Sequence, residues 1–172
     1  MTLLECFDQF RESAFRMETL PWYTDDDERF APFRAGRPLP ERSVRTSPWL
    51  RRIAETTAVG KHWSRIYLLD NQKPLPEHIR FKLVAYAESA TAGENIWIAD
   101  RGADSTLGKL RTDFWLFDAE TDHSFAAIME YGPGGRYLSA RITTEVRECM
   151  AARDLAFRHS VPLNAYLEIT VA

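Results

Sequence analysis

The stretch Asp113-Phe114-Trp115-Leu116-Phe117-Asp118 places four large apolar residues in a row between two aspartates. Side chains alternate along a β-strand, so Phe114 and Leu116 leave one face while Trp115 and Phe117 leave the other. Both faces are then apolar, which is typical of an interior strand that is covered on both sides. We therefore expect residues 113–118 to form the central strand of the fold.

The bulk properties of the chain indicate one globular domain, residues 1–172. Of its 172 residues 45% are hydrophobic and 27% charged, which suits a single chain with its own core. The longest apolar runs, 114–117 and 125–129, fall far short of the roughly 20 residues that a membrane helix needs. The start of the chain has no basic region of a secretory signal, and the isolated Cys6 and Cys149 indicate reduced, buried thiols. We expect a cytoplasmic protein without a membrane partner.

Turn signals and apolar periodicity divide the chain into an N-terminal helical portion, residues 1–60, and a sheet portion, residues 61–172. Helices are expected over residues 2–17, 25–34, 48–60, 77–90 and 145–159. Strands are expected over residues 63–69, 95–99, 113–118, 124–131 and 136–142, with a further edge strand at 165–171. Gly132-Pro133-Gly134-Gly135 predicts a hairpin turn, because a strand and not a helix follows it. The predicted fold class is α+β, with a mostly antiparallel sheet of about five strands covered by helices.

Charge is unevenly spread along the sequence, although the net charge is only −3. Residues 1–31 and 83–172 each carry a net charge of −5, whereas residues 34–82 carry +7. The basic middle could steer an anionic partner; alternatively, its arginines pair with the acidic ends in the folded chain. The candidate basic patch comprises Arg45, Arg51, Arg52 and Lys61.

The strand expected at residues 63–69 carries an arginine among aromatic residues. Trp63, Arg65 and Tyr67 share one face of it. On that face Arg65 could bind a carboxylate or phosphate between stacking rings. Equally, it could be a structural arginine that pairs with an acid at the edge of the core.

The two aspartates that bracket the central strand are candidates for chemistry, although not as a pair. Five residues apart on a strand, Asp113 and Asp118 point to opposite faces and lie about 17 Å apart, too far for a two-carboxylate mechanism. Each could act with residues of other strands, for example Asp113 with Arg65 or Glu94. The structural alternative is that they mark the strand ends, with Asp118 opening the following turn.

Sequence motifs of common catalytic sites are missing. The four histidines are isolated, without the spacing of a zinc site; there is no Gly-x-Ser-x-Gly elbow and no dinucleotide fingerprint. Accordingly, no metal and no cofactor is expected. The candidate ligand- or partner-binding residues are Trp63, Arg65, Tyr67, Glu94, Asp113, Trp115 and Asp118.

Several of these motifs together resemble an actinobacterial family of unknown function. The resemblance covers nearly the whole chain and rests on Phe10-Arg11-x-Ser13-Ala14-Phe15-Arg16-x-Glu18, Trp63-x-Arg65-Ile66, Gly93-Glu94-x-Ile96, Asp113-Phe114-Trp115-Leu116-Phe117-Asp118 and Ala152-Arg153-Asp154-Leu155-Ala156 with Val161-Pro162. Members of that family are often encoded beside helix-turn-helix regulators and small developmental proteins, which implies a regulatory setting or a specialised-metabolite pathway. The resemblance implies no activity and no catalytic residues. What carries over from the family to this chain is only that five residues occupy positions of the shared motifs, namely Arg16, Arg65, Glu94, Asp113 and Asp118.

Three functions remain open. The first is a non-catalytic regulatory or interaction protein that binds a protein partner, which could be a DNA-binding regulator. The second is a small-molecule-binding protein or enzyme with a pocket near Arg65 and Asp113, suited to a small anionic ligand. The third, direct nucleic-acid binding, is disfavoured by the overall acidity and the sequence pI near 5.8.

Overall fold

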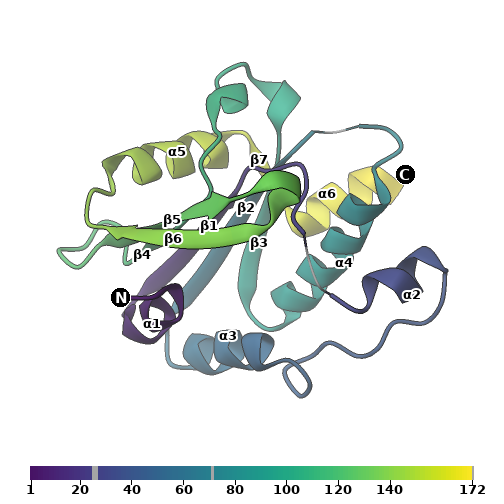
Figure 1. Ribbon diagram of the computed structural model, residues 1–172, viewed down its shortest axis with the longest axis horizontal. Coiled ribbons are helices and arrows are strands. Elements are labelled where there is room, and N and C mark those ends of the chain that lie inside the picture. The colour runs from purple at the N-terminus through teal and green to yellow at the C-terminus, as the bar shows by residue number, and fades with distance from the viewer. Residues whose placement is uncertain (25–26, 71, 172) are drawn as a thin grey trace.

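A computed structural model describes residues 1–24, 27–70 and 72–171 of the chain, without the side chains of residues 170 and 171. Within these residues, seven strands form one sheet and six α-helices surround it (Figure 1). The strands are β1 (Ser13–Glu18), β2 (His62–Leu69), β3 (Glu94–Asp100), β4 (Phe114–Phe117), β5 (Phe125–Tyr131), β6 (Tyr137–Thr143) and β7 (Ser160–Pro162). The helices are α1 (Leu3–Gln9), α2 (Phe30–Arg34), α3 (Pro48–Ala58), α4 (Glu77–Thr91), α5 (Arg147–Arg158) and α6 (Leu163–Val171).

The sheet is mixed, with the strand order β6-β5-β4-β1-β2-β3-β7. Strands β1, β2 and β3 run parallel to one another, whereas β4, β5, β6 and β7 pair with their neighbours antiparallel. The α+β class is confirmed. The expectation of about five mostly antiparallel strands differs from the structure in detail: the described sheet has seven strands, and although four of its six strand pairings are antiparallel, β1, β2 and β3 form a parallel core.

Strand β4 carries the stretch from which the fold was predicted, and its two apolar faces are confirmed. Trp115 and Phe117 belong to one apolar cluster, and Phe114 and Leu116 belong to another on the opposite face. All four side chains are at most 5% exposed. The strand is therefore interior, next to the middle strand β1.

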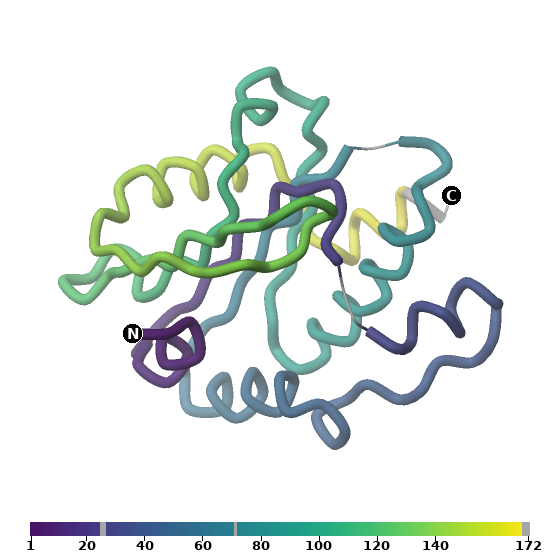
Figure 2. Tube along the Cα trace, viewed as in Figure 1, coloured from purple at the N-terminus to yellow at the C-terminus, as the bar shows by residue number. Residues whose placement is uncertain are grey.

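Helices cover both faces of the sheet, as Figure 1 shows. On the face of Trp115 lie α1, α3, α4 and α6, which contribute residues to two apolar clusters, one around Trp63 and one around Tyr67. On the opposite face α5 packs against β2, β3 and β4. The connection from β1 to β2 is long; it contains α2 and α3, and its first part passes outside α4 (Figure 2).

The helix expected over residues 2–17 is wrong in its second half. The capping box of Thr2 and Glu5 is present, but α1 ends at Gln9 and the chain continues as β1. The apolar residues from Leu3 to Met17 fit helical spacing by coincidence, since Ala14, Phe15 and Met17 are buried from both faces of a strand. The middle strand of the sheet thus lies within the portion that was expected to be helical.

Two further expectations need correction. Residues 165–171 belong to α6 and not to an edge strand; the edge strand is β7, immediately before it. Of the helix expected at residues 25–34, the structure shows α2 from Phe30 onward, and residues 25 and 26 lie outside the described residues. The helices expected near residues 48–60, 77–90 and 145–159 and the turn at residues 132–135 are confirmed.

Candidate functional site

Five charged residues, four of them buried and one partly buried, lie side by side on the sheet face that α3 and α4 cover. This charge cluster comprises Arg16 and Glu18 of β1, Arg65 of β2, Glu94 of β3 and Asp113 just before β4. Their side chains are between 0% and 11% exposed. Strand alternation places Arg65 between Trp63 and Tyr67, so the cluster separates the two apolar clusters of this face.

Ion pairs connect the cluster from β3 to β1. Arg65 Nε donates to Glu94 Oε1 at 2.8 Å, and Arg65 Nη1 lies 3.0 Å from Glu18 Oε2. The second arginine, Arg16, lies 3.9 Å from Glu18 and donates to Asp113 Oδ2 at 2.9 Å. Each buried charge therefore has an opposite charge beside it, which offsets the free energy of removing it from water.

Asp113 ties the cluster to the chain that leaves β1. Its Oδ1 accepts hydrogen bonds of 2.7 Å from both the backbone N–H and the hydroxyl of Thr19. Its Oδ2 accepts from Arg16 and, at 2.5 Å, from the hydroxyl of Tyr23. The Asp113 carboxylate thus fixes the start of the β1–β2 connection, and Tyr23 in turn accepts from the Leu20 N–H at 3.1 Å.

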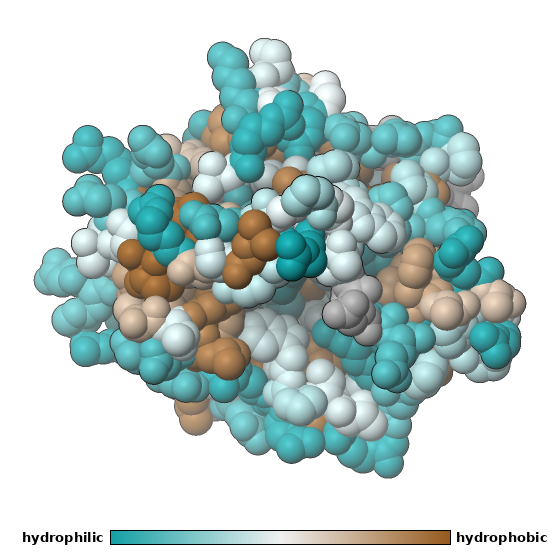
Figure 3. Space-filling view, viewed as in Figure 1, coloured by the Kyte–Doolittle hydropathy of each residue, from teal (hydrophilic) through white to brown (hydrophobic). Residues whose placement is uncertain are grey.

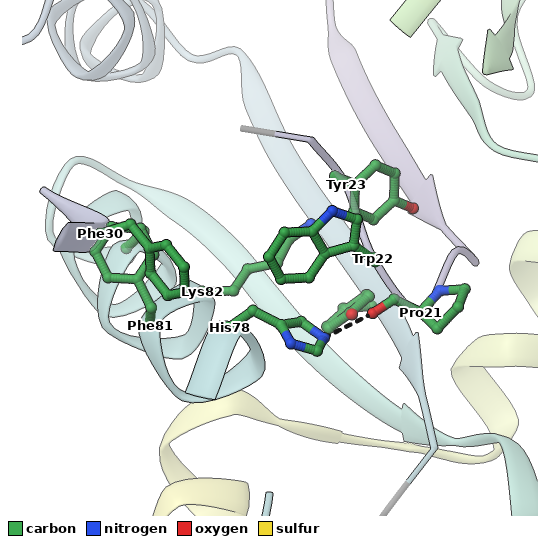
Figure 4. Close-up of a pocket in the computed structure, with 9 residues that line it drawn as sticks. Pro21, Trp22, Tyr23, Phe30, His78, Phe81 and Lys82 are labelled. Atoms are coloured by element: carbon green, nitrogen blue, oxygen red, sulfur yellow. Dashed lines mark hydrogen bonds between the residues drawn. The ribbon is translucent and has the colours of Figure 1, made fainter. Parts of the chain in front are cut away.

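Helix α4 adds a lysine to the cluster. Lys82 Nζ lies 3.4 Å from Glu18 Oε1 and 3.6, 4.8 and 5.7 Å from the ring centroids of Tyr23, Tyr67 and Tyr86. Figure 4 shows Lys82 extending from α4 toward Tyr23. Burial lowers the pKa of the Lys82 ammonium to about 8, although the Glu18 carboxylate favours its charged form. Lys82 is therefore a cation that titrates near neutral pH.

Glu18 is the carboxylate on which these cations converge. Burial by itself would raise its pKa, but the charges of Lys82, Arg65 and Arg16 and the hydrogen bond from the Tyr86 hydroxyl outweigh burial. The pKa of Glu18 is thus held well below its ordinary value. In contrast, burial raises the pKa of Tyr23 and Tyr86, so both keep their hydroxyl protons.

Glu18, Arg65 and Lys82 form one side of a polar cavity of about 330 Å³. Its other walls come from α3, α4, Tyr23 and Thr24, and the β5–β6 hairpin, and Figure 3 shows a hollow beside that hairpin. The remaining residues that line it are Tyr23, Thr24, Arg42, Trp49, Ala85, Tyr86, Ser89, Tyr131, Gly135 and Tyr137. The polar cavity thus combines three cations with an aromatic wall.

A smaller apolar pocket of about 70 Å³ adjoins the polar cavity and shares Tyr23, Lys82 and Ala85 with it. Trp22, Phe30 and Phe81 contribute aromatic walls (Figure 4). Near its rim, His78 Nε2 lies 3.0 Å from the carbonyl oxygen of Pro21. The shared residues Tyr23, Lys82 and Ala85 therefore lie between the two spaces.

Close backbone contacts hold the wall of the polar cavity at the hairpin. The Thr24 N–H donates to the Gly135 carbonyl at 3.1 Å, and the Thr24 hydroxyl donates to the Gly134 carbonyl at 2.6 Å. Gly135 has φ +73°, and a Cβ at this position would lie 2.2 Å from the carbonyl oxygen of Trp22. Only glycine fits here.

Two buried atoms of the charge cluster, Arg16 Nη1 and Glu94 Oε2, have no hydrogen-bond partner among the described residues. Buried polar atoms of folded proteins are nearly always paired. The charge cluster therefore has one hydrogen-bond donor, Arg16 Nη1, and one acceptor, Glu94 Oε2, that no hydrogen bond among the described residues uses.

Comparison with known families identifies the chain. Residues 1–168 match a family described as a domain of unknown function, DUF6879. The chain belongs to this family. No curated protein sequence matches it. As a DUF6879 member it shares a family without an assigned activity, so its function has to be inferred from the geometry of the site.

This DUF6879 chain shows neither a metal-binding cluster nor a membrane-spanning helix among its described residues. Among the described residues, no group of three or more histidine, cysteine, aspartate or glutamate side chains is arranged to hold a metal ion. Nor does any helix in the described ranges have the length and apolarity required to cross a membrane.

The sequence-predicted candidates occupy different places in the structure. Arg65, Tyr67, Glu94, Asp113 and Trp115 all lie in or against the charge cluster, with Trp115 facing Arg65 at 5.7 Å from its ring centroid. In contrast, Trp63 belongs to the apolar core, and its indole N–H donates to Thr56 Oγ1 at 2.7 Å. Asp118 lies at the other end of β4, away from the cavity.

Asp118 follows β4 and opens the next turn, where its carbonyl accepts from the Thr121 N–H at 3.2 Å, as the second interpretation of the aspartates predicted. Its carboxylate has a further structural role that the sequence did not indicate. Its carboxylate accepts four hydrogen bonds of 2.7–3.1 Å from the backbone N–H groups of Arg11, Glu12 and Ser13. Its own backbone N–H donates to the Ser13 carbonyl at 2.8 Å, with φ at +49°. Asp118 therefore anchors the connection between α1 and β1.

The expected basic patch is largely engaged within the chain. Arg45 pairs with Glu41, Arg52 with Asp8 at 2.6 Å, and Lys61 donates to the Phe10 carbonyl. Arg51 donates to the carbonyl oxygens of Val44 and Arg45. One of the two expectations for this segment was that its arginines pair with the acidic ends of the chain. Arg52 does so, because its partner Asp8 belongs to the acidic N-terminal region.

Several residues of the site were not predicted from the sequence, namely Glu18, Tyr23, Arg42, Lys82, Tyr86 and Tyr131. They come from five separate segments, so no local spacing connects them. A usable signal exists only on α4, where Lys82 and Tyr86 are four residues apart and therefore share one helix face.

Proposed function

We propose that this protein binds a small anionic ligand in the polar cavity, with Lys82, Arg65 and Arg42 as the cations that attract it. The observation that carries this proposal is the charge of the cavity wall. Those three cations line it together with one carboxylate, Glu18, among the described residues. A carboxylate or phosphate group entering the cavity would meet excess positive charge at low exposure to water, where charge interactions are strong.

The size and walls of the cavity define the ligand further. A volume of about 330 Å³ is at the lower end of the range for small-molecule sites. Trp49, Tyr131 and Tyr137 offer ring faces and edges for a planar or apolar part of the ligand. The best candidate is a compact carboxylate or phosphate that also carries an aromatic ring.

Binding, and not catalysis, is what the arrangement supports best. Asp113 and Glu94, the expected acid–base residues, are absent from the described wall of the polar cavity. Both oxygens of Asp113 already accept hydrogen bonds from Thr19, Arg16 and Tyr23.

The other expectations from the sequence stay predictions. The resemblance to an actinobacterial family encoded beside helix-turn-helix regulators supports a regulatory protein in the cytoplasm that binds a protein partner. A ligand-binding cavity is compatible with this role, since a regulator often responds to a small molecule.

The test is a calorimetric and thermal-shift screen of small carboxylates and phosphates, with and without an aromatic ring. A ligand at one hundred times its Kd stabilises the folded chain by about 2.7 kcal/mol, which raises Tm by several degrees. Lys82→Met keeps the side-chain volume and should weaken that binding at least about tenfold, as should Arg42→Gln. Arg45→Gln, which removes an exposed ion pair outside the cavity, is the matched control. Equal affinity in all three variants, or no stabilising compound, would refute the proposal.

A further inference from the structure

Exposed cations without an ion pair are present even where the sequence is acidic overall. Residues 83–172 carry a net charge of −5, yet six exposed cations of this region form no ion pair among the described residues. Four of the six share one surface. They are Lys109, Arg111, Arg141 and Arg147. The basic middle segment, in contrast, is largely paired internally.

These four cations line one groove of about 700 Å³, on the sheet face opposite the polar cavity. The groove lies between the chain that enters β4, the end of β6 and the first half of α5. Figure 1 shows α5 and the β3–β4 connection next to each other over this face. We call this surface the cationic groove.

The floor of the cationic groove is apolar and follows the register of the sheet. Met17, Phe114 and Ile128 pair in sequence across β1, β4 and β5, and Ile128 pairs with Arg141 on β6. All four residues line the groove. The apolar row formed by Met17, Phe114 and Ile128 therefore ends next to the cation Arg141 on the outer strand β6.

The balance of charge in the groove favours an anionic occupant. Two carboxylates, Glu145 and Glu148, also line it, so the cations exceed the acids. The N-terminus of α5 contributes the positive end of its helix dipole, and its first residue follows Val146, which provides no side-chain cap.

We propose that the cationic groove binds an acidic peptide segment of a partner protein, with apolar side chains on the floor and carboxylates against the rim. Charge complementarity and the apolar floor carry this assignment. A nucleic acid fits less well, because the one aromatic residue of the described lining, Phe114, is only 1% exposed and offers no open ring face on which a base could stack. The proposal concerns a different surface from the polar cavity and does not depend on the ligand proposed there.

The test uses a short fluorescent peptide in which leucine and phenylalanine alternate with glutamate, measured by fluorescence anisotropy. Two further probes are a twin peptide with lysine in place of glutamate and a single-stranded oligonucleotide of equal negative charge. We expect the acidic peptide to bind, its affinity to fall as salt rises, and the twin peptide and the oligonucleotide not to bind.

The decisive variant is the double substitution Arg141→Glu/Arg147→Glu, which should weaken binding of the acidic peptide at least about tenfold. Arg11→Glu/Arg158→Glu changes the net charge equally, outside the groove, and should bind as the wild type does. Circular dichroism verifies that both variants are folded; an acid in the first turn of α5 favours that helix. Unchanged peptide affinity in the decisive variant, a preference for the oligonucleotide, or a wild-type dimer that this variant converts to monomers would overturn the proposal.

Discussion

Arg16 and Arg65 lie directly opposite each other on the parallel strands β1 and β2, and both guanidinium carbons face the ring of Trp115, at 5.8 and 5.7 Å from its centroid. Two like charges are thus neighbours inside the fold. Glu18 contacts both, and Glu94 and Asp113 flank them. Because apolar residues of similar volume often stabilise a core more than buried ion pairs do, we associate this arrangement with binding and not with stability.

Substitution of the shared carboxylate should destabilise the protein strongly. Glu18→Gln leaves Arg65 and Lys82 buried with less opposite charge, which we expect to lower the free energy of unfolding by about 3–5 kcal/mol at neutral pH. The control Glu41→Gln, at an exposed ion pair, should unfold as the wild type does in urea.

The same substitution has a pH signature. The folded-state pKa of Glu18 lies below its ordinary value of 4.5, so its stabilising contribution is present above that value and is lost as pH falls below it. The stability difference between wild type and Glu18→Gln should therefore narrow in acid. A difference that stays constant from pH 7 to pH 3 would contradict the ion pairing described above.

Lys82 should make stability depend on pH in the alkaline range. Its pKa is about 8 in the folded chain and 10.5 ordinarily, so between these values the unfolded chain binds more protons and stability rises with pH. Urea unfolding of the wild type relative to Lys82→Met should show this rise from pH 8 to pH 10. Parallel pH profiles of the two proteins would disprove the lowered pKa.

Ligand binding should carry a proton signature at the same residue. An anion beside Lys82 favours the ammonium form, so binding above pH 8 should take up a proton. Calorimetry in two buffers with different ionisation enthalpies measures this uptake. Lys82→Met should abolish the buffer dependence, whereas Arg42→Gln should keep it.

Asp118 is expected to be an anchor for the backbone at the N-terminal side of β1. Asp118→Ala removes four hydrogen bonds to a charged acceptor and should cost at least about 3 kcal/mol. Asp118→Asn retains an acceptor oxygen and tolerates positive φ, so chemical unfolding should give it an intermediate stability. If the two variants are equally stable, the carboxylate is not the anchor.

The hairpin wall of the polar cavity offers a matched pair of glycines. A Cβ on Gly135 would lie 2.2 Å from the Trp22 carbonyl oxygen, whereas on Gly134 its nearest neighbour would be Thr24 Oγ1 at 3.7 Å. Both have φ near +70°, so alanine costs a similar backbone strain at each. Gly135→Ala should be less stable than Gly134→Ala by about 1–3 kcal/mol, and Trp22 fluorescence should report the displaced wall. Equal effects of the two substitutions would show that the contact is not tight.

Parts of the fold could be predicted because their signal is local. Four consecutive apolar residues between two aspartates defined β4, and proline and glycine marked the limits of α3. In contrast, β1 was missed because the apolar residues from Leu3 to Met17 fit helical spacing, although Arg16 and Glu18 are buried in the sheet. Their burial depends on Asp113, Arg65 and Lys82, which are distant in sequence, so only tertiary structure reveals it.

The site was predictable where charged residues share or flank a strand with aromatic residues, as Arg65 does with Tyr67 and Asp113 with Trp115. The α6 segment shows the opposite problem. Its β-branched residues favour a strand by propensity, yet Leu163 and Tyr166 pack from a helix against Ile96 and Ile98. Tertiary packing overrides local preference there.

The two outer strands of the sheet have unequal capacity to recruit another strand. β7 has three residues and ends in Pro162, which lacks a backbone donor, whereas β6 has seven residues and exposes Tyr137 and Leu138. Copies of the chain joined through their sheets would therefore meet β6 to β6 around a two-fold axis. Such contact closes on itself and yields discrete pairs in place of fibres.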